Sequence, residues 1–536
     1  MPPPAPPPSR SVVWRSTLHL YTVGLTVVLG GQYFSWNAGL AAGSLAFLIS
    51  IFLMGVGYFC LCCCLAEISS MVPFTTSAFG LARWTCGFYL GFLVGCCEVL
   101  QNILYVACAV VQLARLVTQL LPSTAPYRAA VWLVCYVAGS TLLAGGGRVY
   151  WRWNVILASV SLGLLVVYVG GSIPLLVASF PPLTPPTSDD VAACVHAFPL
   201  AASFFVGIEA LNHHAPHVAA PAIVIPRAQL ACMATLLVTA LGVFFASLVH
   251  ATADLPTALS PLAAGFQHIF QASDAVATAL SIPATFATAQ GFAQSYTHSL
   301  VALAHSRLLP PRLAVPHATF HTHVAAIAVG SALSFAVCFA ADSASTVLFN
   351  VSLLCACVAY ASQCAGFIAL RRDHRELDRP FRSPVGVPGA AVSLLVWAGT
   401  AVALVAFQDD CYVAAGVTVA SLALASLYYV AYAKRRQGFS PDELRSLLFA
   451  HVAALNARHR RRARRHSIDH VPTFLLQYFL PKAAPTKYKK SLPAIYRKGH
   501  KVRHVNCAVT VSIGRSVGRA SIGRAADAIV APNLPT

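Results

Sequence analysis

Twelve long apolar runs constrain this chain more than any other feature of its sequence. Each has about the 20 residues that a helix needs to cross a bilayer, and none alternates as the strands of a closed β-barrel would. The runs cover roughly residues 19–38, 43–66, 88–116, 129–145, 153–178, 194–213, 227–250, 273–303, 322–340, 346–370, 387–407 and 411–432. The sequence therefore predicts an all-α polytopic membrane protein of about twelve transmembrane helices.

The composition excludes the soluble alternatives. Only 10% of the 536 residues are charged, against about 25% in a soluble globular chain, and the mean hydropathy is +0.69. An apolar surface of this size must face lipid, so we expect the bilayer as a partner and no nucleic acid. The sequence also lacks a phosphate-binding loop, a nucleophile elbow and an HExxH motif, so we expect neither an enzyme nor a cofactor.

The positive charge is concentrated at one end of the chain. The first lysine is Lys434, and residues 433–536 hold 21 of the 36 basic residues but only 4 of the 17 acidic ones. We therefore divide the chain into a proline-rich N-terminus (1–18), a nearly neutral membrane domain (19–432) and a basic, mostly disordered tail (433–536).

Arginines outside the tail indicate the orientation, because cytoplasmic loops are enriched in basic residues. They fall in alternate loops, and aspartates such as Asp254 and Asp342 fall in the others, with only Arg115 and Arg128 out of pattern. This predicts a multi-pass protein of the plasma membrane with both termini cytoplasmic. The basic loop residues are Arg83, Arg148, Arg152, Arg227, Arg307, Arg312, Arg371, Arg372, Arg375, Arg379 and Arg382.

Six arginines within residues 456–465 form the densest basic run of the tail, and a looser one follows from Lys482 to Arg503. A polybasic segment close to a membrane span attracts anionic lipid, although a solvated, disordered tail has the same composition. Ser467 follows two arginines and a histidine, which is typical of a basophilic kinase site. Its phosphorylation is expected to weaken lipid binding.

Acidic residues within apolar runs are costly and therefore candidates for function. Glu98 lies in the middle of the third run, and Asn102 and Tyr105 continue the same helical face. This polar face either lines a cavity or joins two helices. Glu67 lies at the end of the second run, where an interfacial carboxylate that caps a loop is the simpler interpretation.

Two runs contain residues that interrupt a helix. The first contains Gly30, Gly31 and Gln32, and the sixth contains Gly207 followed by Glu209. Interrupted helices in corresponding positions indicate inverted repeats with a binding site near the membrane midplane, whereas two unrelated kinks are the alternative.

Hydroxyl side chains form a polar ladder in the eighth run. Most such hydroxyls bond to carbonyls of their own helix, but Ser281 and Thr285 could supply oxygen ligands to a cation. A histidine cluster, formed by His213, His214 and His217, has the composition of a metal site. It lacks an acidic ligand and the spacing of a catalytic zinc helix, so we expect no metal.

Several motifs together resemble one transporter family. They are Gly30–Gly39 (GGQYFSWNAG), Ala66–Pro73 (AEISSMVP) with Ala78–Arg83, Gly91–Gly95 with Glu98, Phe204–Glu209 with Ile225–Arg227, Tyr296–Pro310, and Arg371–Arg372 with Arg379–Arg382. Over roughly residues 12–435 the chain resembles the amino acid–polyamine–organocation (APC) permeases, and most of all their ethanolamine permease branch.

The resemblance implies five-plus-five inverted repeats with broken helices 1 and 6, plus two further helices, as in leucine-transporter-like folds. It implies that the Gly30 and Gly31 amides hold a substrate carboxylate or hydroxyl, and that carbonyls of the broken sixth helix meet an amine. Glu209 would act as a proton-linked gate and Phe204 or Phe205 as an occluding aromatic. We expect the substrate-binding residues to be Gly30, Gly31, Gln32, Glu98, Asn102, Phe204, Phe205 and Gly207.

The sequence departs from its relatives in its charged residues. Histidines stand at 213, 214 and 217 where acidic residues are common, His298 replaces a basic residue, and no lysine precedes Lys434. The coupling ion, proton or sodium, stays open. The function expected is secondary transport of an amino acid, polyamine or ethanolamine by alternating access, by a monomer or a homodimer. A channel or a transport-dead receptor is the alternative.

Overall fold

The computed structural model describes residues 10–72, 77–185, 191–218, 220–410, 412–440, 443, 444 and 448, without the side chains of Arg10, Ser11, Pro216 and His217. The predictions for the proline-rich N-terminus before residue 10, for the basic runs of the tail and for Ser467 fall outside these residues. The same holds for the side chain of His217.

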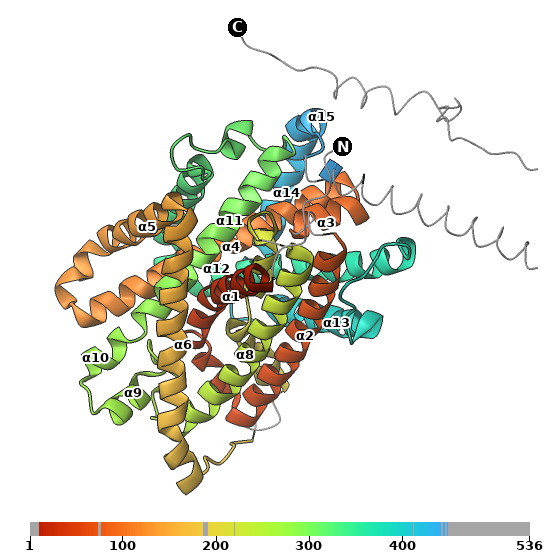
Figure 1. The fold of residues 1–536 in the computed structure, drawn as a ribbon. Helices are drawn as coiled ribbons and strands as arrows, with labels where there is room; N and C mark the ends of the chain where they lie inside the picture. The colour runs from red at the N-terminus through yellow and green to blue at the C-terminus, as the bar shows by residue number, and fades with distance from the viewer. Residues whose placement is uncertain are drawn as a thin grey trace, which may run out of the picture. The chain divides into compact units, whose positions relative to one another are not determined.

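The described chain folds into helices joined by short connections (Figure 1). The α-helices are α1 (Arg10–Val28), α2 (Ser44–Met71), α3 (Ala78–Thr85), α4 (Phe88–Leu120), α5 (Arg128–Gly145), α6 (Gly147–Ala178), α7 (Val191–Ala197), α8 (Pro221–Val249), α9 (Ala263–Phe270), α10 (Asp274–Ala279), α11 (Ile282–His305), α12 (Val324–Asp373), α13 (Gly386–Ala406), α14 (Val413–Tyr428) and α15 (Lys434–Arg436). Single-turn or irregular helices are η1 (Leu29–Gln32), η2 (Asn37–Ala42), η3 (Pro122–Tyr127), η4 (Phe198–Phe204), η5 (Ile208–His217), η6 (Leu255–Thr257), η7 (Pro311–Ala314) and η8 (Tyr429–Ala433).

Ten helical segments in the described ranges are long and apolar enough to cross a membrane, fewer than the twelve expected. Two differences account for the count. The ninth and tenth predicted runs are counted together as the 50-residue α12, but its backbone leaves helical geometry at Ala344, so two helices meet there, at the predicted boundary between the runs. The eighth run forms α10 and α11, and the hydroxyl and amide side chains of α11 make it less apolar than the ten.

The two predicted helix interruptions are present, and they lie against each other. The α-helix of the first run ends at Val28, and the sixth run continues beyond Ala197 as a 3-10 segment to Phe204, followed by a turn that ends at Gly207, whose φ of +103° favours glycine. A Cβ on Gly31 would overlap the carbonyl oxygen of Ser203, which shows how closely the two interrupted segments approach. The inverted-repeat symmetry itself stays a prediction.

Helix α4 forms the centre of the bundle. It packs along α11 and α12, and most of its length is buried, whereas α5, α6 and α14 expose most of theirs. The exposed helices present apolar side chains such as Val134, Val166 and Leu424, as expected for surfaces that face lipid. The polar residues of α4 therefore lie inside the bundle, where they can contact the two interrupted segments.

Candidate functional site

A cavity of about 660 Å³ enters the bundle from one end, which we call the cavity end. It is lined by residues 256–259 after α8, residues 345–350 at the α12 kink and residues 408–410 after α13. Helix α4 contributes Tyr105, Cys108, Gln112 and Arg115 to its wall. The cavity therefore reaches from the loops of this end to the central helix.

Aromatic side chains lie at the inner limit of this cavity. The ring of Tyr105 stacks on that of Phe292, with centroids 4.1 Å apart, and lies 6.1 Å from that of Phe349. The Tyr105 hydroxyl lies 3.5 Å from the point that a Cβ on Gly31 would occupy. The cavity thus ends against the first helix interruption, where a midplane site is expected.

The cavity wall carries charges of both signs. Arg115 donates to the carbonyl oxygen of Asp342 at 2.7 Å, and His196 lies 3.5 Å from the Asp409 carboxylate. The amide of Asn350 donates to one carboxylate oxygen of Asp410 at 3.3 Å. A small solute with both an ammonium and a carboxylate can therefore find an oppositely charged group for each.

Glu209 joins three parts of the bundle next to the second interruption. Its Oε1 accepts hydrogen bonds from Gln101 of α4 at 2.9 Å and from the Tyr360 hydroxyl of α12 at 2.8 Å. Its Oε2 accepts from the backbone N–H of Gly207 at 3.1 Å. A change in the charge of this carboxylate would alter all three contacts at once, which is the arrangement that a gate requires.

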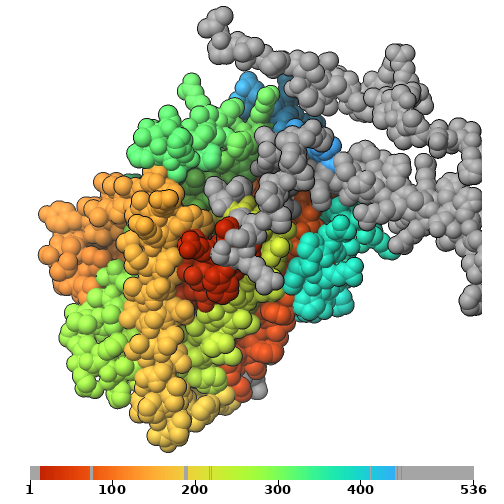
Figure 2. Space-filling view, viewed as in Figure 1, coloured from red at the N-terminus to blue at the C-terminus, as the bar shows by residue number. Residues whose placement is uncertain are grey.

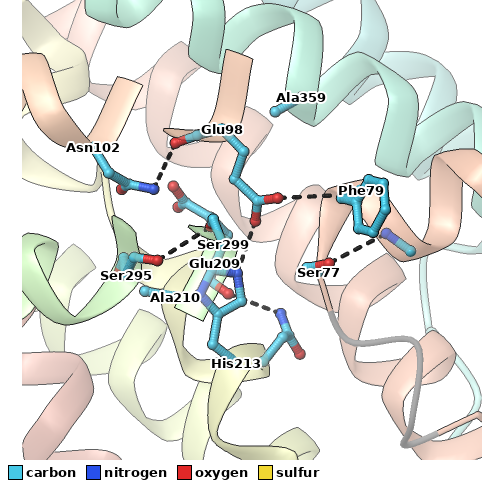
Figure 3. A network of polar contacts seen from close by, with 12 residues as sticks. Ser77, Phe79, Glu98, Asn102, Glu209, Ala210, His213, Ser295, Ser299 and Ala359 are labelled. Carbon is cyan, nitrogen blue, oxygen red and sulfur yellow. Dashed lines mark hydrogen bonds and ion pairs between the residues drawn. The ribbon is translucent and has the colours of Figure 1, made fainter. Parts of the chain in front are cut away.

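Glu98 of α4 pairs with His213, which belongs to the segment after the second interruption (Figure 3). Its Oε1 lies 2.7 Å from Nε2 of His213 in η5, and both side chains are buried. Its Oε2 accepts the backbone N–H of Phe79 in α3 at 3.4 Å, and its own carbonyl accepts from Asn102 at 2.7 Å. Glu98 thus connects α3, α4 and η5, and does not line the 660 Å³ cavity.

Glu67 is completely buried and holds two arginines from the end of α12 and the loop after it. Its carboxylate forms two hydrogen bonds with Arg371, at 2.9 and 2.6 Å, and lies 3.1 Å from Nε of Arg379. It also accepts the backbone N–H of Ser383 at 2.7 Å. Glu67 therefore caps the loop after α12, as predicted, but it does so from a fully buried position and not from one in contact with water.

A third ion pair lies where the chain leaves the bundle. Arg83 of α3 lies 3.3 Å from Glu443 and donates to the carbonyl oxygen of Gly438 at 2.8 Å. Burial lowers the pKa of the Arg83 guanidinium, and the charge of Glu443 opposes this shift. We call the end of the bundle that holds the Glu67, Glu98 and Arg83 ion pairs the clamp end.

The predicted glycine and glutamine positions are engaged by protein groups. The Gly30 N–H donates to Oγ1 of Thr288 at 2.9 Å, and Gln32 donates to the carbonyl oxygen of Leu236 at 3.4 Å. Phe204 and Phe205 are fully buried beside the interruption, and Phe205 packs on Tyr58. None of the eight predicted substrate-binding residues lines the 660 Å³ cavity, so their roles stay predictions about another state of the bundle.

The two predicted cation ligands bond within the protein. The hydroxyl of Ser281 lies 2.9 Å from that of Ser260, and Thr285 donates to the carbonyl of Ser281 at 2.9 Å. Their neighbour Thr288 instead contacts the first interruption. The role of Ser281 and Thr285 in cation binding therefore stays a prediction without support from this geometry.

Three histidines that depart from the family pattern gather at the clamp end. The rings of His213 and His214 lie 6.0 and 5.5 Å from that of His298 in α11. Among the residues that the structure describes, no three His, Cys, Asp or Glu side chains are placed to hold a metal ion. His298 and His214 instead lie beside His213, which pairs with Glu98.

Sequence reasoning did not identify the partners in these contacts. Tyr360, Gln101 and Arg379 come from segments far from Glu209 and Glu67 in the chain, and a single sequence does not show such pairings. Arg379 stands in a basic loop, from which the sequence predicts the orientation but not a partner for Glu67.

The comparisons with known proteins agree with this architecture. A family model described as amino acid permease matches residues 16–430, which include every described helix from α2 to α14. A search of curated proteins finds no match. Because the family match covers most of the chain, this multi-pass membrane protein belongs to the amino acid permease family.

Proposed function

We propose that the chain is a secondary active transporter of a small amine-bearing solute that works by alternating access. The observation that carries the proposal is the asymmetry of the bundle around the two interruptions. A 660 Å³ cavity approaches them from one end, while buried ion pairs close the other. Such a bundle needs only to exchange the open and closed ends to move a solute past a fixed midplane site.

The cavity wall favours an amino acid as the solute. Arg115 offers a positive group and Asp409 and Asp410 offer negative ones, which matches a zwitterion. Ethanolamine and polyamines, which carry no carboxylate, use only one of the two kinds of group. They remain the competing substrates because of the resemblance to the ethanolamine permease branch.

We further propose that protonation of Glu209 is linked to opening. Glu209 bonds to α4, to α12 and to the turn at Gly207, so its charge state bears on three segments together. Protonation of Glu209 would remove the charge that these three contacts share and weaken them together, which favours a proton rather than a sodium gradient as the driving force. By the distribution of arginines, the clamp end faces the cytoplasm.

Purified full-length protein in liposomes tests this proposal. We expect saturable, concentrative uptake of a labelled amino acid when a proton gradient is imposed, and less uptake of ethanolamine and polyamines. Uptake that follows the solute gradient alone would indicate a channel. Saturable binding without uptake would indicate a receptor, and both results would overturn the proposal.

A further inference from the structure

A second pocket, of about 480 Å³, lies between the beginning of α6 and helix α1. Among the residues that the structure describes, it is lined by His19, Arg148, Trp151, Arg152, Val155 and Ile156. Figure 2 shows α1, in red, beside the orange α6 on the surface of the molecule. The pocket belongs to the clamp end, because the ring of Trp151 lies 6.1 Å from that of His214.

Two arginines give this pocket its charge. Arg148 and Arg152 stand one helical turn apart on α6, and both side chains are exposed. Neither has a hydrogen bond or ion pair with the described part of the chain. They differ in this from Arg83, Arg371 and Arg379 at the same end, which are held by carboxylates. Two guanidinium groups without a partner favour an anionic ligand that two donors can hold together.

One wall of the pocket is formed by an aromatic pair and by the apolar side chains of Val155 and Ile156. Trp151 stacks on the ring of His19, with centroids 5.5 Å apart and planes within 25°, so an aromatic pair joins α6 to α1. Tryptophan is typical of the level of lipid headgroups, because one edge of its ring is polar and the rest is apolar. The pocket therefore combines a charged rim with an aromatic wall.

The surface of α6 beyond the pocket is apolar. Ile156 at the edge of the pocket is 53% exposed, and Val160 and Val167, which follow on the same side of the helix, are 42% and 43% exposed. This track leads away from the arginines along a helix that spans the membrane. A ligand with a negative head and long hydrocarbon chains fits both parts, whereas a small soluble anion would use only the arginines.

We propose that this pocket binds the headgroup of an anionic phospholipid. The phosphate lies between Arg148 and Arg152, and the acyl chains follow Ile156 and Val160. The site is separate from the basic tail, and it does not depend on the transport function proposed above. Since His19 belongs to the helix that is interrupted at Gly30, a bound lipid would also hold α1 against α6.

Native mass spectrometry of the full-length protein in detergent, with added phosphatidylglycerol or phosphatidylcholine, tests this proposal. We expect preferential binding of phosphatidylglycerol, and an affinity about 30-fold lower for the double variant Arg148→Gln/Arg152→Gln. The variant Arg148→Lys/Arg152→Lys should retain most of the binding. Arg227→Gln, which removes an exposed arginine of α8 outside the pocket, is the matched control and should bind phosphatidylglycerol as the unmodified protein does. All variants keep the basic tail, so the tail cannot account for a difference between them.

Three results would overturn the proposal. The first is equal binding of the two lipids, and the second is an equal loss of binding in Arg227→Gln and in the double variant. The third is displacement of phosphatidylglycerol by millimolar inorganic phosphate, which would assign the pocket to a soluble anion. A symmetrical size-exclusion peak for the double variant shows that loss of binding is not loss of folding.

Discussion

The two ends of the bundle differ in how their polar residues are used. At the cavity end, Arg115, Asp409 and Asp410 line a 660 Å³ space. At the clamp end, Glu67 and Glu98 are buried and joined to basic side chains from other helices. The same kinds of residue therefore face a solute at one end and hold helices together at the other.

This difference indicates what opening of the clamp end requires. Three ion pairs that join α2, α4 and α3 to α12, η5 and the chain after α15 would have to break or move. Separating buried ion pairs costs several kcal/mol of free energy. Protonation of one of the groups, or binding of the substrate to the open state, can supply this free energy.

Glu67→Gln should have the largest effect on the clamp end. The substitution leaves Arg371 and Arg379, whose side chains are 26% and 12% exposed, without a carboxylate, and we expect a loss of about 1.5–3 kcal/mol of stability. Thermal stability measured by size-exclusion chromatography checks this. Arg372→Gln is the control, because the neighbouring Arg372–Asp373 pair is exposed and such pairs contribute at most about 1 kcal/mol. Equal losses in both variants would contradict a buried clamp.

Glu209→Gln should abolish gradient-driven uptake while the protein stays folded and inserted. The neutral side chain cannot change its charge during the cycle, so we expect uptake at least about tenfold lower. Uptake into liposomes as a function of pH measures this, with Asp373→Asn as a control for the loss of an exposed carboxylate. Normal uptake with normal pH dependence would show that Glu209 has no gating role.

The Glu98–His213 pair offers a sharper test of which end Glu98 serves. Glu98→Gln and His213→Gln should each lower thermal stability, and the double variant should lose about 1–3 kcal/mol less than the sum. The apparent affinity for substrate should change less than about twofold, because Glu98 does not line the cavity. Additive losses of stability, or a large loss of apparent affinity for the substrate, would contradict this and indicate that Glu98 contributes to the substrate site.

The smallest effect is expected at the cavity end, where His250 follows α8. Burial, followed by the nearby His268, lowers the pKa of His250, and its ring bonds to Ser172 at 3.0 Å. As the pH falls through about 6.5, His250 takes up a proton more readily in the unfolded state than in the folded state. The free energy of unfolding is therefore higher above this pH and decreases below it. Thermal stability between pH 7.5 and 5.5 should fall less steeply in His250→Gln. Identical slopes would exclude this contribution.

Local features of the sequence were enough to predict much of the fold. Apolar runs predict the helices, and Gly30, Gly31 and Gly207 predict where two of them lose α-helical geometry, because both signals depend on residues close together in the chain. The boundary between the ninth and tenth runs was also predicted, at residues 341–345, and the backbone leaves helical geometry there, at Ala344.

The site was less predictable because its contacts are between distant segments. Glu98 and Glu209 were recognised as buried charges, but their partners His213 and Tyr360 depend on how helices pack. The sequence left open whether the polar face of Glu98 lines a cavity or joins two helices, and the structure pairs Glu98 with His213 of η5. A buried charge thus indicates that a partner exists without indicating which one.

The central claim is that only one end of the bundle is open at a time, and cysteine accessibility tests it most directly. Thr346→Cys lines the cavity, and Asn212→Cys lies at the clamp end and is 2% exposed in the native residue. The background is a variant in which the native cysteines that react with maleimide, including the exposed Cys86 and the cavity-lining Cys108, are replaced by serine. In this background, a membrane-impermeant maleimide should label Thr346→Cys and not Asn212→Cys. Substrate with a proton gradient should lower labelling of Thr346→Cys and raise that of Asn212→Cys. Simultaneous labelling at both positions, or no change on adding any substrate, would contradict alternating access.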